Sequence, residues 1–259
     1  IERFGQHFFK EGAKVIPGNT AYSQNYAAVE LNATFQGVPV DAYADQLIGL
    51  KITGQRSGIT ATVSSVLTSS DSERGNPTLY VSYLASSVQD NSTETFFDGE
   101  NIAADGNILS GLLGNEIIAT GEPFASTVAE NATSTGSAFS IVNGVYFIRG
   151  QFVNVDDETL ILDQYTNTPS YRIGLYITEE IITPDQDETL TDNSQGYNNY
   201  AAPGADRLKV STSLFKKPLT DYNDENFVEL AVIENGILRS QKTKTEYNVI
   251  ADELARRTF

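Results

Sequence analysis

The chain has 259 residues, and its 17 Lys and Arg against 34 Asp and Glu give a formal net charge of −17. With no Cys and a single His, it cannot contain a disulfide scaffold, a thiol nucleophile or a metal site built from Cys or several His side chains. The acidic balance argues against nucleic acid and anionic membranes as partners, and no run of about 20 apolar residues is present that could insert into a bilayer.

The N-terminal part is predicted to consist of short strands and one short helix. Residues 59–64 alternate apolar and hydroxyl side chains, and 78–84 is a second stretch of strand-forming residues. Short strands separated by Gly turns are typical of a small barrel-like unit. The helix is predicted over residues 39–48, where apolar residues after a proline recur at the spacing of one helix face: Val40, Tyr43, Ala44 and Leu47.

Residues 86–135 are looser and rich in Ser, Thr, Asn, Gly and Ala, with two Asp-Gly turn signals. We interpret this stretch as the boundary between two units, or as an insertion that completes the first one.

From residue 137 onwards the strand signal is strongest. The long apolar run 171–183 predicts a central strand covered on both faces, and residues 208–214 alternate like a further strand. Residues 244–257 combine helical spacing with a capping-box sequence and two terminal Arg, which predicts a helix. Two Asn-Gly pairs each predict a two-residue hairpin turn, because both turn positions need a positive φ: Asn143-Gly144 and Asn235-Gly236.

The sequence therefore predicts a mainly β fold in two units. Residues 1–135 are expected to form a small barrel-like unit with a short helix and a Ser/Thr/Asn/Gly-rich insertion. Residues 136–259 are expected to form a β-sandwich-like unit that ends in a helix. Because the chain starts at Ile1 without Met and stops where the last helical pattern is barely closed, we interpret it as a piece of a longer polypeptide.

Little in the sequence points to catalysis. A Ser–His–acid arrangement would need His7, which lies between Gln6 and aromatic residues, and neither a nucleophile elbow nor a phosphate-binding Gly loop occurs. A glycosidase needs only two carboxylates, which the 34 acidic residues cannot exclude, but Trp for stacking sugars is absent. We therefore expect no enzymatic activity and no cofactor.

The best metal candidate is the acidic stretch 185–193, where Asp185, Asp187 and Asp192 could ligate a hard cation such as Ca²⁺. The turn-making Gly of an EF-hand loop is missing, and Gly196 stands where its bidentate Glu would be. A solvated acidic loop explains the stretch more simply, so no metal site is predicted.

Residues 193–207 form a candidate partner-contact segment. This stretch is long, mostly uncharged and rich in small residues, as expected of an extended arm that lies on a partner chain through main-chain contacts and Tyr anchors. An ordered surface loop within the domain is the alternative. The expected contact residues are Tyr197, Asn198, Asn199, Tyr200 and Pro203.

Four blocks of the sequence resemble a domain family of uncharacterised function in virion structural proteins of tailed phages, best represented among cyanophages and other marine phages with contractile tails. The blocks are Asn-Gly-Val-Tyr-Phe-Ile-Arg-Gly-Gln-Phe-Val at 143–153, Ser-Tyr-Arg-Ile-Gly-Leu at 170–175, Ala-Ala-Pro-Gly-Ala-Asp-Arg-Leu-Lys at 201–209 and Leu-Ala-Arg-Arg-Thr at 254–258. A further block, 52–63, is similar to small β-units of phage tail and baseplate proteins.

The resemblance implies a non-enzymatic structural protein located in the virion, in the phage tail, at the baseplate or where tail fibres attach. Its implied partners are other virion proteins, such as baseplate, tube or fibre subunits, and further copies of itself, without nucleic acid or membrane insertion. That family has no assigned catalytic residues, so none are carried over. Two alternatives remain open. A receptor- or glycan-binding tail-fibre module predicts an exposed aromatic cluster, and a tail-associated glycan hydrolase predicts paired carboxylates in a cleft.

Overall fold

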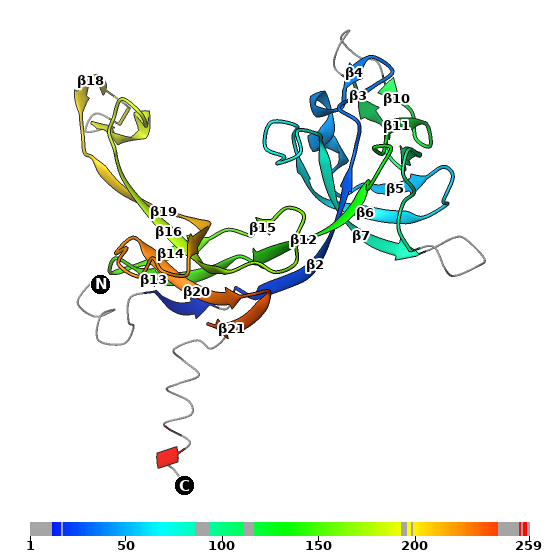
Figure 1. Ribbon diagram of the computed structural model, residues 1–259. Helices are drawn as coiled ribbons and strands as arrows, with labels where there is room; N and C mark the ends of the chain where they lie inside the picture. The colour runs from blue at the N-terminus through cyan, green and yellow to red at the C-terminus, as the bar shows by residue number, and fades with distance from the viewer. Residues whose placement is uncertain are drawn as a thin grey trace. The chain divides into compact units, whose positions relative to one another are not determined.

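The fold is mainly β, as the sequence predicts: 56% of the residues lie in strands and 6% are helical, and among the described residues no helix has seven or more residues. These values come from a computed structural model, shown in Figure 1. It describes residues 12–16, 18–85, 94–110, 117–192, 196–197, 199–242, 254 and 256–257. In this part of the chain no closed barrel is found. Nor does any helix in it have the length and apolar character that crossing a membrane requires.

The chain divides into two compact units, and neither is continuous in the sequence. Unit 1 comprises residues 1–22, 139–160 and 170–259, and unit 2 comprises residues 23–138 and 161–169. The chain passes from one unit to the other within β2 (Thr20–Glu30), β12 (Thr133–Ile141) and β15 (Glu158–Asp163). The sequence predicts two consecutive units that meet at 135/136. The compact units have other boundaries, because strand pairing joins segments that are far apart in the sequence.

Unit 2 is organised around a sheet with the strand order β11-β8-β5-β6-β7-β2-β12-β15. Besides β2, β12 and β15, this sheet contains β5 (Lys51–Gly54), β6 (Thr60–Leu67), β7 (Thr78–Ala85), β8 (Asn101–Ala104) and β11 (Pro123–Ser126). Two short antiparallel pairs accompany the sheet: β3 (Thr34–Phe35) with β4 (Val38–Pro39), and β9 (Ile108–Leu109) with β10 (Ile117–Ile118).

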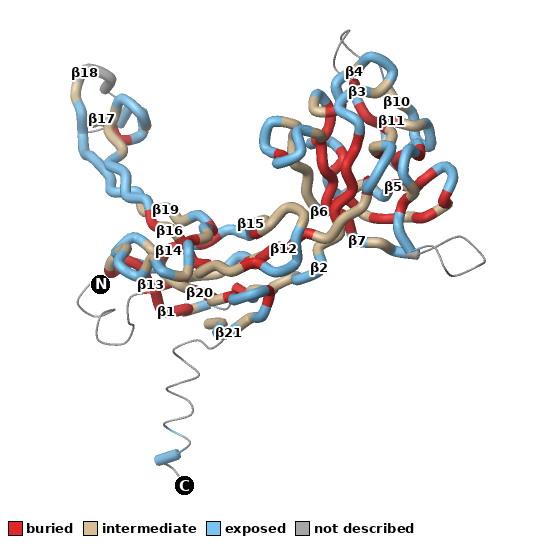
Figure 2. The backbone as a smooth tube through the Cα atoms, in the orientation of Figure 1, coloured by how far each residue is buried: buried red, intermediate tan, exposed pale blue. Residues whose placement is uncertain are grey.

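The core of unit 2 is filled by apolar side chains from these strands, which Figure 2 shows as buried segments. Alternation puts Ala61 and Val63 of β6 inside, as predicted for a half-buried strand. The buried Tyr43 hydroxyl donates a hydrogen bond to the carbonyl of Phe124 (2.6 Å), so the polar end of this ring is satisfied inside the core.

The helix predicted over 39–48 is present only as two short 3₁₀ helices, η1 (Val40–Ala42) and η2 (Ala44–Leu47). The predicted apolar face is confirmed, since all four of its residues are buried: Val40, Tyr43, Ala44 and Leu47. A regular helix does not form because Tyr43 has a non-helical φ of −132°, which breaks the helix in the middle, and Gly49 turns the chain with a φ of 82°.

Unit 1 contains a three-stranded sheet and a four-stranded sheet. The first has the order β1-β13-β14, with β1 (Ala13–Ile16), β13 (Gly144–Ile148) and β14 (Gln151–Val155). The second has the order β19-β16-β20-β21, with β16 (Tyr171–Ile182), β19 (Arg207–Pro218), β20 (Phe227–Glu234) and β21 (Ile237–Gln241). Gly12, just before β1, lies against Val228 of β20, so the two sheets are in contact.

One of the two predicted Asn-Gly hairpins is confirmed and the other is wrong. Asn235 and Gly236 have φ angles of 50° and 75° and join β20 to β21. Asn143 and Gly144 join no hairpin, because β12 pairs with β2 and β15 whereas β13 pairs with β1 and β14. The left-handed turn of this region is instead formed one strand later, by Arg149 (φ 52°) and the glycine after it, between β13 and β14.

The C-terminal helix predicted over 244–257 lies mostly outside the described residues. Leu254, Arg256 and Arg257, which are described, are helical.

Candidate interaction site

β16 and β19 form an antiparallel pair that runs beyond the sheet to which it belongs. Each residue of β16 faces one residue of β19 over the full length of both strands. On the other side of β16, β20 pairs only with residues 171–176. From residue 177 onwards the pair is therefore two-stranded. We name residues 177–212 the arm, which consists of the distal halves of β16 and β19 and of the tip, residues 183–206, between them (Figure 1).

Burial changes where the arm begins (Figure 2). Ile173 and Leu175 in the first half of β16 are buried, whereas residues 178–181 are exposed. On β19, Leu214 is buried and residues 207–209 are exposed. The prediction of a central strand covered on both faces therefore holds for the first half of β16. For the second half it is wrong, because β20 does not pair that far along the strand.

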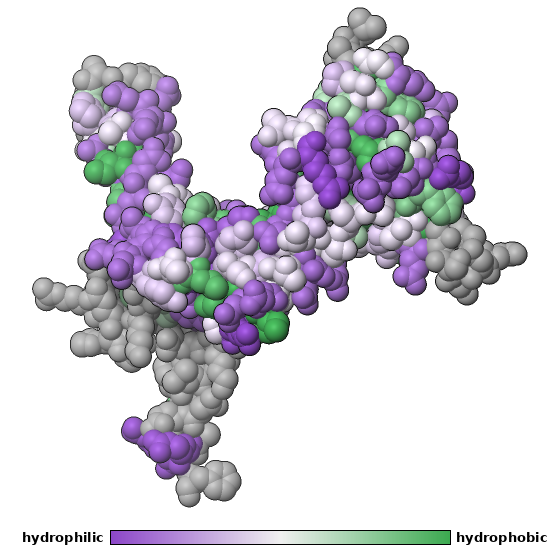
Figure 3. Space-filling view, in the orientation of Figure 1, coloured by the Kyte–Doolittle hydropathy of each residue, from purple (hydrophilic) through white to green (hydrophobic). Residues whose placement is uncertain are grey.

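The two faces of the arm differ in chemistry. One face carries the apolar side chains of Ile181, Leu208 and Val210 together with Glu179. The register places Ile181 directly opposite Leu208, and Glu179 opposite Val210. Ile181 is 62% exposed and Leu208 is 49% exposed. The other face pairs Glu180 with Lys209 across the strands. Figure 3 shows this region as hydrophilic apart from one apolar spot, so the exposed apolar residues stand out from their surroundings.

The arm as a whole is acidic. It holds seven acidic residues against two basic ones, Arg207 and Lys209, which gives it a formal net charge of −5. The acidic residues are Glu179, Glu180, Asp185, Asp187, Glu188, Asp192 and Asp206.

Arg172 holds the base of the arm. Its Nε lies 2.6 Å from a carboxylate oxygen of Glu229 on β20, and its guanidinium stands over the rings of Tyr222 (4.6 Å) and Phe227 (5.7 Å). Arg172 is only 12% exposed, so this pair is less screened by water than a surface ion pair.

Lys217, on β19, is bound by two carboxylates of the loop that follows the strand. It pairs with Asp221 (3.1 Å) and Asp224. The hydrogen bond from Lys217 lowers the pKa of the Asp224 carboxyl below its usual value. Arg172 and Lys217 face each other in the register of β16 and β19, so both strands are held at the base of the arm by ion pairs on the same face of the sheet.

Arg149 braces the start of the arm from the β13–β14 turn. Its Nε lies 3.3 Å from Glu179, and its Nη2 donates a hydrogen bond to Asn226 Oδ1 (2.6 Å). One side chain thus connects the turn, the arm and the loop before β20. The sequence does not reveal the contact between Arg149 and Glu179, because these residues are 30 positions apart and belong to no common motif.

The tip contains η3 (Glu188–Leu190) and a short antiparallel pair, β17 (Thr191–Asp192) with β18 (Asn199–Pro203). Asp187 caps η3 by accepting hydrogen bonds from the Thr189 amide (3.0 Å) and hydroxyl (2.7 Å). These bonds lower the pKa of the Asp187 carboxyl. Leu190 is buried and its carbonyl accepts a hydrogen bond from the amide of Gly204 (3.0 Å). The tip is therefore folded on itself and not simply extended.

The structure places the predicted contact residues on this tip. Tyr197 is 65% exposed, and Pro203 is exposed in β18 opposite Thr191. The backbone of Asn199 and Tyr200 belongs to β18. Their side chains, and Asn198 as a whole, lie outside the described residues.

The three candidate metal ligands, Asp185, Asp187 and Asp192, are all on the arm but are not brought together. In the described part of the chain, no group of three or more His, Cys, Asp or Glu side chains could hold a metal ion. Asp187 is instead used as the cap of η3. His7 lies outside the described residues.

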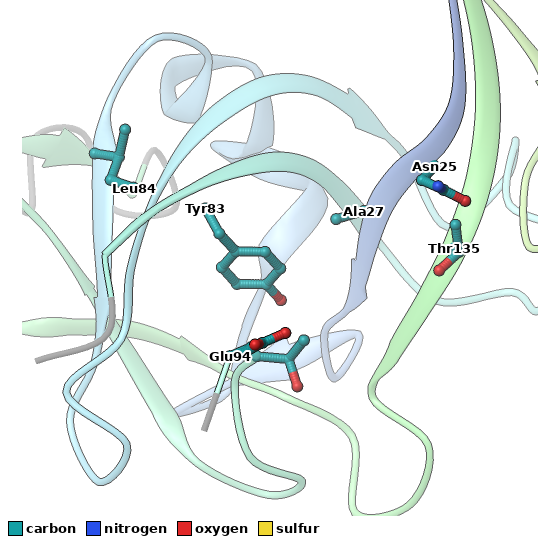
Figure 4. A pocket seen from close by; sticks show the side chains of 7 residues that line it. Asn25, Ala27, Tyr83, Leu84, Glu94 and Thr135 are labelled. Atoms are coloured by element: carbon teal, nitrogen blue, oxygen red, sulfur yellow. The ribbon is translucent and has the colours of Figure 1, made fainter. Parts of the chain in front are cut away.

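Four hollows in the described part of the surface are each lined by a single carboxylate. The hollow in Figure 4, in unit 2, has a volume of about 540 Å³ and is lined by one carboxylate, Glu94, toward which the Tyr83 hydroxyl is directed. Burial raises the pKa of Tyr83 to about 12. Three further hollows are also lined by a single carboxylate each, Glu122, Asp156 and Asp105. None of these four has the pair that glycoside hydrolysis needs.

Comparison with known proteins gives one match. The model of a family described as "Domain of unknown function (DUF4815)" matches residues 86–259, a range that is more than half of the chain and includes the whole arm. Neither a curated protein nor a solved structure matches the chain.

Proposed function

The chain belongs to the DUF4815 family, a domain family of unknown function, and from the geometry of its arm we propose that it is a structural protein of a tailed-phage virion that acts through protein–protein contacts. The arm is the observation that carries this proposal. Among the described residues, its strands pair only with each other beyond Ile177 and bury few side chains, so they add little to the core of unit 1. Isolated two-stranded ribbons are marginally stable in water. An arm with exposed apolar residues is instead typical of a contact surface.

The class of protein is supported by the resemblance of blocks 143–153, 170–175, 201–209 and 254–258 to virion structural proteins of tailed phages. The mainly β fold and the acidic composition fit the same class. We place the protein at the baseplate or at the attachment of tail fibres, where the arm contacts neighbouring subunits, including further copies of this chain.

A receptor- or glycan-binding module of a tail fibre is the second candidate. The observation that favours it is the ring pair of Tyr176 and Phe215 near the base of the arm, with centroids 5.8 Å apart and Phe215 48% exposed. Exposed aromatic pairs can stack on sugar rings. Binding of the chain to a glycan array, with loss of binding in Phe215→Ala, would favour this candidate over assembly.

The proposed assembly role is tested by replacing the tip, residues 183–206, with an Asn-Gly turn. Ile182 and Arg207 face each other in the last pair of the strands, so a two-residue turn can join them. The thermal unfolding midpoint should stay nearly unchanged, because the hydrogen bonds of Asp187 and of the Leu190 carbonyl are made within the tip, to Thr189 and Gly204. Incorporation of the labelled chain into phage particles should fall at least tenfold, since interface aromatic residues such as Tyr197 typically contribute about 1–3 kcal/mol each.

Ile48→Ala is the control, because Ile48 is also an exposed apolar residue (51%) but lies in unit 2, outside the arm and its base. It should be incorporated normally. A narrower change, Tyr197→Ala with Tyr200→Ala, should reproduce the defect of the tip replacement. Normal incorporation of the variant without a tip would contradict the proposed role of the arm. Location of the label within intact particles distinguishes the baseplate from a fibre.

A further inference from the structure

The outer edge of β19 carries backbone groups along the arm that pair with no other strand among the described residues. β19 is the edge strand of its sheet in the part of the chain that the structure describes. The Leu214 amide donates to the Glu158 carboxylate (2.7 Å) and not to β16, so it points outward. Backbone groups alternate along an antiparallel strand, and Leu208, Val210 and Thr212 therefore also present their N–H and C=O groups outward.

This open edge has two defined ends. It begins at Arg207, the first residue of β19, and it ends at Leu214, where the Glu158 carboxylate takes the position that a neighbouring strand would occupy. Between these ends lie residues 207–213, and their midpoint is Val210. The outward residues Leu208 and Thr212 lie symmetrically on either side of it.

We propose that a second copy of this chain pairs with the outer edge of β19, antiparallel and about a two-fold axis at Val210. Leu208 then faces Thr212 of the second copy, Val210 faces its own counterpart, and β16 and β19 of both copies form one four-stranded sheet. Such an interface is isologous and closes with two chains. The inference rests on the proposed function and identifies a partner of the arm.

The charges along β19 fit a second copy in this register. Arg207 and Lys209 lie in one half of the open edge, and Ser211 and Ser213 lie in the other half. Antiparallel pairing about Val210 sets each basic residue opposite a serine, so no like charges face each other directly. On the face that carries Ile181 and Leu208, Val210 meets its own counterpart across the two-fold axis, and Glu179, opposite Val210 within each copy, stays paired with Arg149.

The opposite edge of the arm is less suited to strand addition. The Ile177 amide donates to the carbonyl of Asn226 (2.8 Å), and the next outward residue, Glu179, is held by Arg149. On that edge only a short stretch around Ile181 is left. The geometry thus favours the β19 edge, and the two edges can be compared directly.

Engineered disulfides test the register in the full chain, which has no native Cys. Two residues that face each other in a hydrogen-bonded antiparallel pair have Cα atoms about 5.5 Å apart, within the range of a disulfide. Val210→Cys should therefore give a covalent dimer on mild oxidation. Ser213→Cys, on the same strand and also accessible, should stay monomeric, because the two copies of residue 213 would lie roughly 20 Å apart along the strands.

Two proline variants in the Val210→Cys background identify the edge. Leu208→Pro and Ile181→Pro each remove one exposed apolar side chain and one outward N–H, on opposite edges of the arm, without touching the bonds between β16 and β19. Leu208→Pro should reduce the cross-linked fraction at least tenfold, and Ile181→Pro should leave it within about twofold. Equal thermal unfolding midpoints of the two variants confirm that both are folded.

These experiments test the dimer separately from the proposed assembly role. A chain that sediments as a monomer at 100 μM, or equal cross-linking of the two Cys variants, overturns it. Equal cross-linking of the two proline variants also overturns it. If the chain fails to dimerise but the variant without a tip is still not incorporated into particles, the inference fails while the proposed function stands. If the chain dimerises as described but the variant without a tip is incorporated normally, the inferred dimer stands and the proposed role of the arm in assembly fails.

Discussion

Glu100 is a buried carboxylate whose oxygens are fully used inside the fold. One oxygen accepts hydrogen bonds from the amides of Arg56 (3.1 Å) and Ser57 (2.9 Å), and the other from the Ser57 hydroxyl (2.8 Å) and the Phe97 amide (2.6 Å). These four hydrogen bonds tie the β5–β6 turn to the segment before β8.

Tyr43 gives a stability prediction at high pH. Burial raises the pKa of Tyr43 to about 12 from an ordinary value near 10. In the unfolded chain the phenol ionises near pH 10, whereas in the folded chain it keeps its proton. Its contribution to stability is therefore complete below pH 10 and is lost between about pH 10 and 12. In that window the free energy of unfolding should fall by about 1.4 kcal/mol per pH unit for this residue.

Urea unfolding between pH 8 and 12 measures this slope. Tyr43→Phe should be less stable than the parent at pH 8, because the hydrogen bond to Phe124 is lost. It should also show a shallower decline above pH 10. Burial likewise raises the pKa of Tyr146, in unit 1, to about 12, so a residual slope is expected in the variant. An unchanged slope in Tyr43→Phe would contradict the assignment.

At the scale of elements, Gly144 is required for a close approach of two strands and not for a turn. A Cβ at residue 144 would lie 2.6 Å from the backbone nitrogen of Gly18 and 3.0 Å from the carbonyl oxygen of Ile16. Gly144→Ala should therefore lower the free energy of unfolding by about 2–3 kcal/mol, because β1 and β13 must separate.

The control for this prediction is Gly121→Ala. Gly121 has a φ of 85° but no neighbouring atom within 4 Å of an added Cβ, so only the backbone strain of about 1 kcal/mol is expected. Both values follow from chemical denaturation. If Gly144→Ala is no more destabilising than Gly121→Ala, the close approach of the strands is not what requires glycine at 144.

The elements themselves could be predicted from the sequence, but their partners could not. The alternation of residues 59–64 and 208–214 correctly predicts strands, and Asn235-Gly236 correctly predicts a hairpin turn, because each of these patterns depends only on neighbouring residues. Asn143-Gly144 carries the same local signal and forms no hairpin, since the strands before and after it pair with other segments.

The arm shows the same limit for the candidate site. The small, polar composition of 193–207 located its tip in the sequence. The exposed half of β16 could not be predicted, because the apolar pattern of β16 does not show how far along it β20 pairs. A signal was nevertheless present: Thr178-Glu179-Glu180 interrupts the apolar run at the point where burial is lost.

At the scale of the whole molecule, the order of segments decides which fragments can fold. Unit 1 needs residues 1–22 as well as 139–160 and 170–259. Its strand β1 pairs with β13, setting Ala13 opposite Phe147 and Lys14 opposite Tyr146, and both aromatic residues are buried. A fragment that starts at residue 136 lacks β1 and leaves this side of β13 uncovered.

We therefore expect the fragment 136–259 to unfold at a lower urea concentration than unit 1 with its N-terminal segment, or without a cooperative transition. Residues 1–22 can be joined to 139–259 by a short Gly-Ser linker, because the Val142 amide donates to the carbonyl of Asn19 (2.8 Å) and the chain ends to be joined lie beside each other. The linked chain regains β1 and should unfold in one sigmoidal transition. Each large side chain that β1 covers contributes roughly 1.5–3 kcal/mol, which exceeds the entropy of closing a short linker. If the fragment 136–259 unfolds as cooperatively and at the same midpoint as the linked chain, β1 is dispensable and the boundary near residue 135 separates two independent domains.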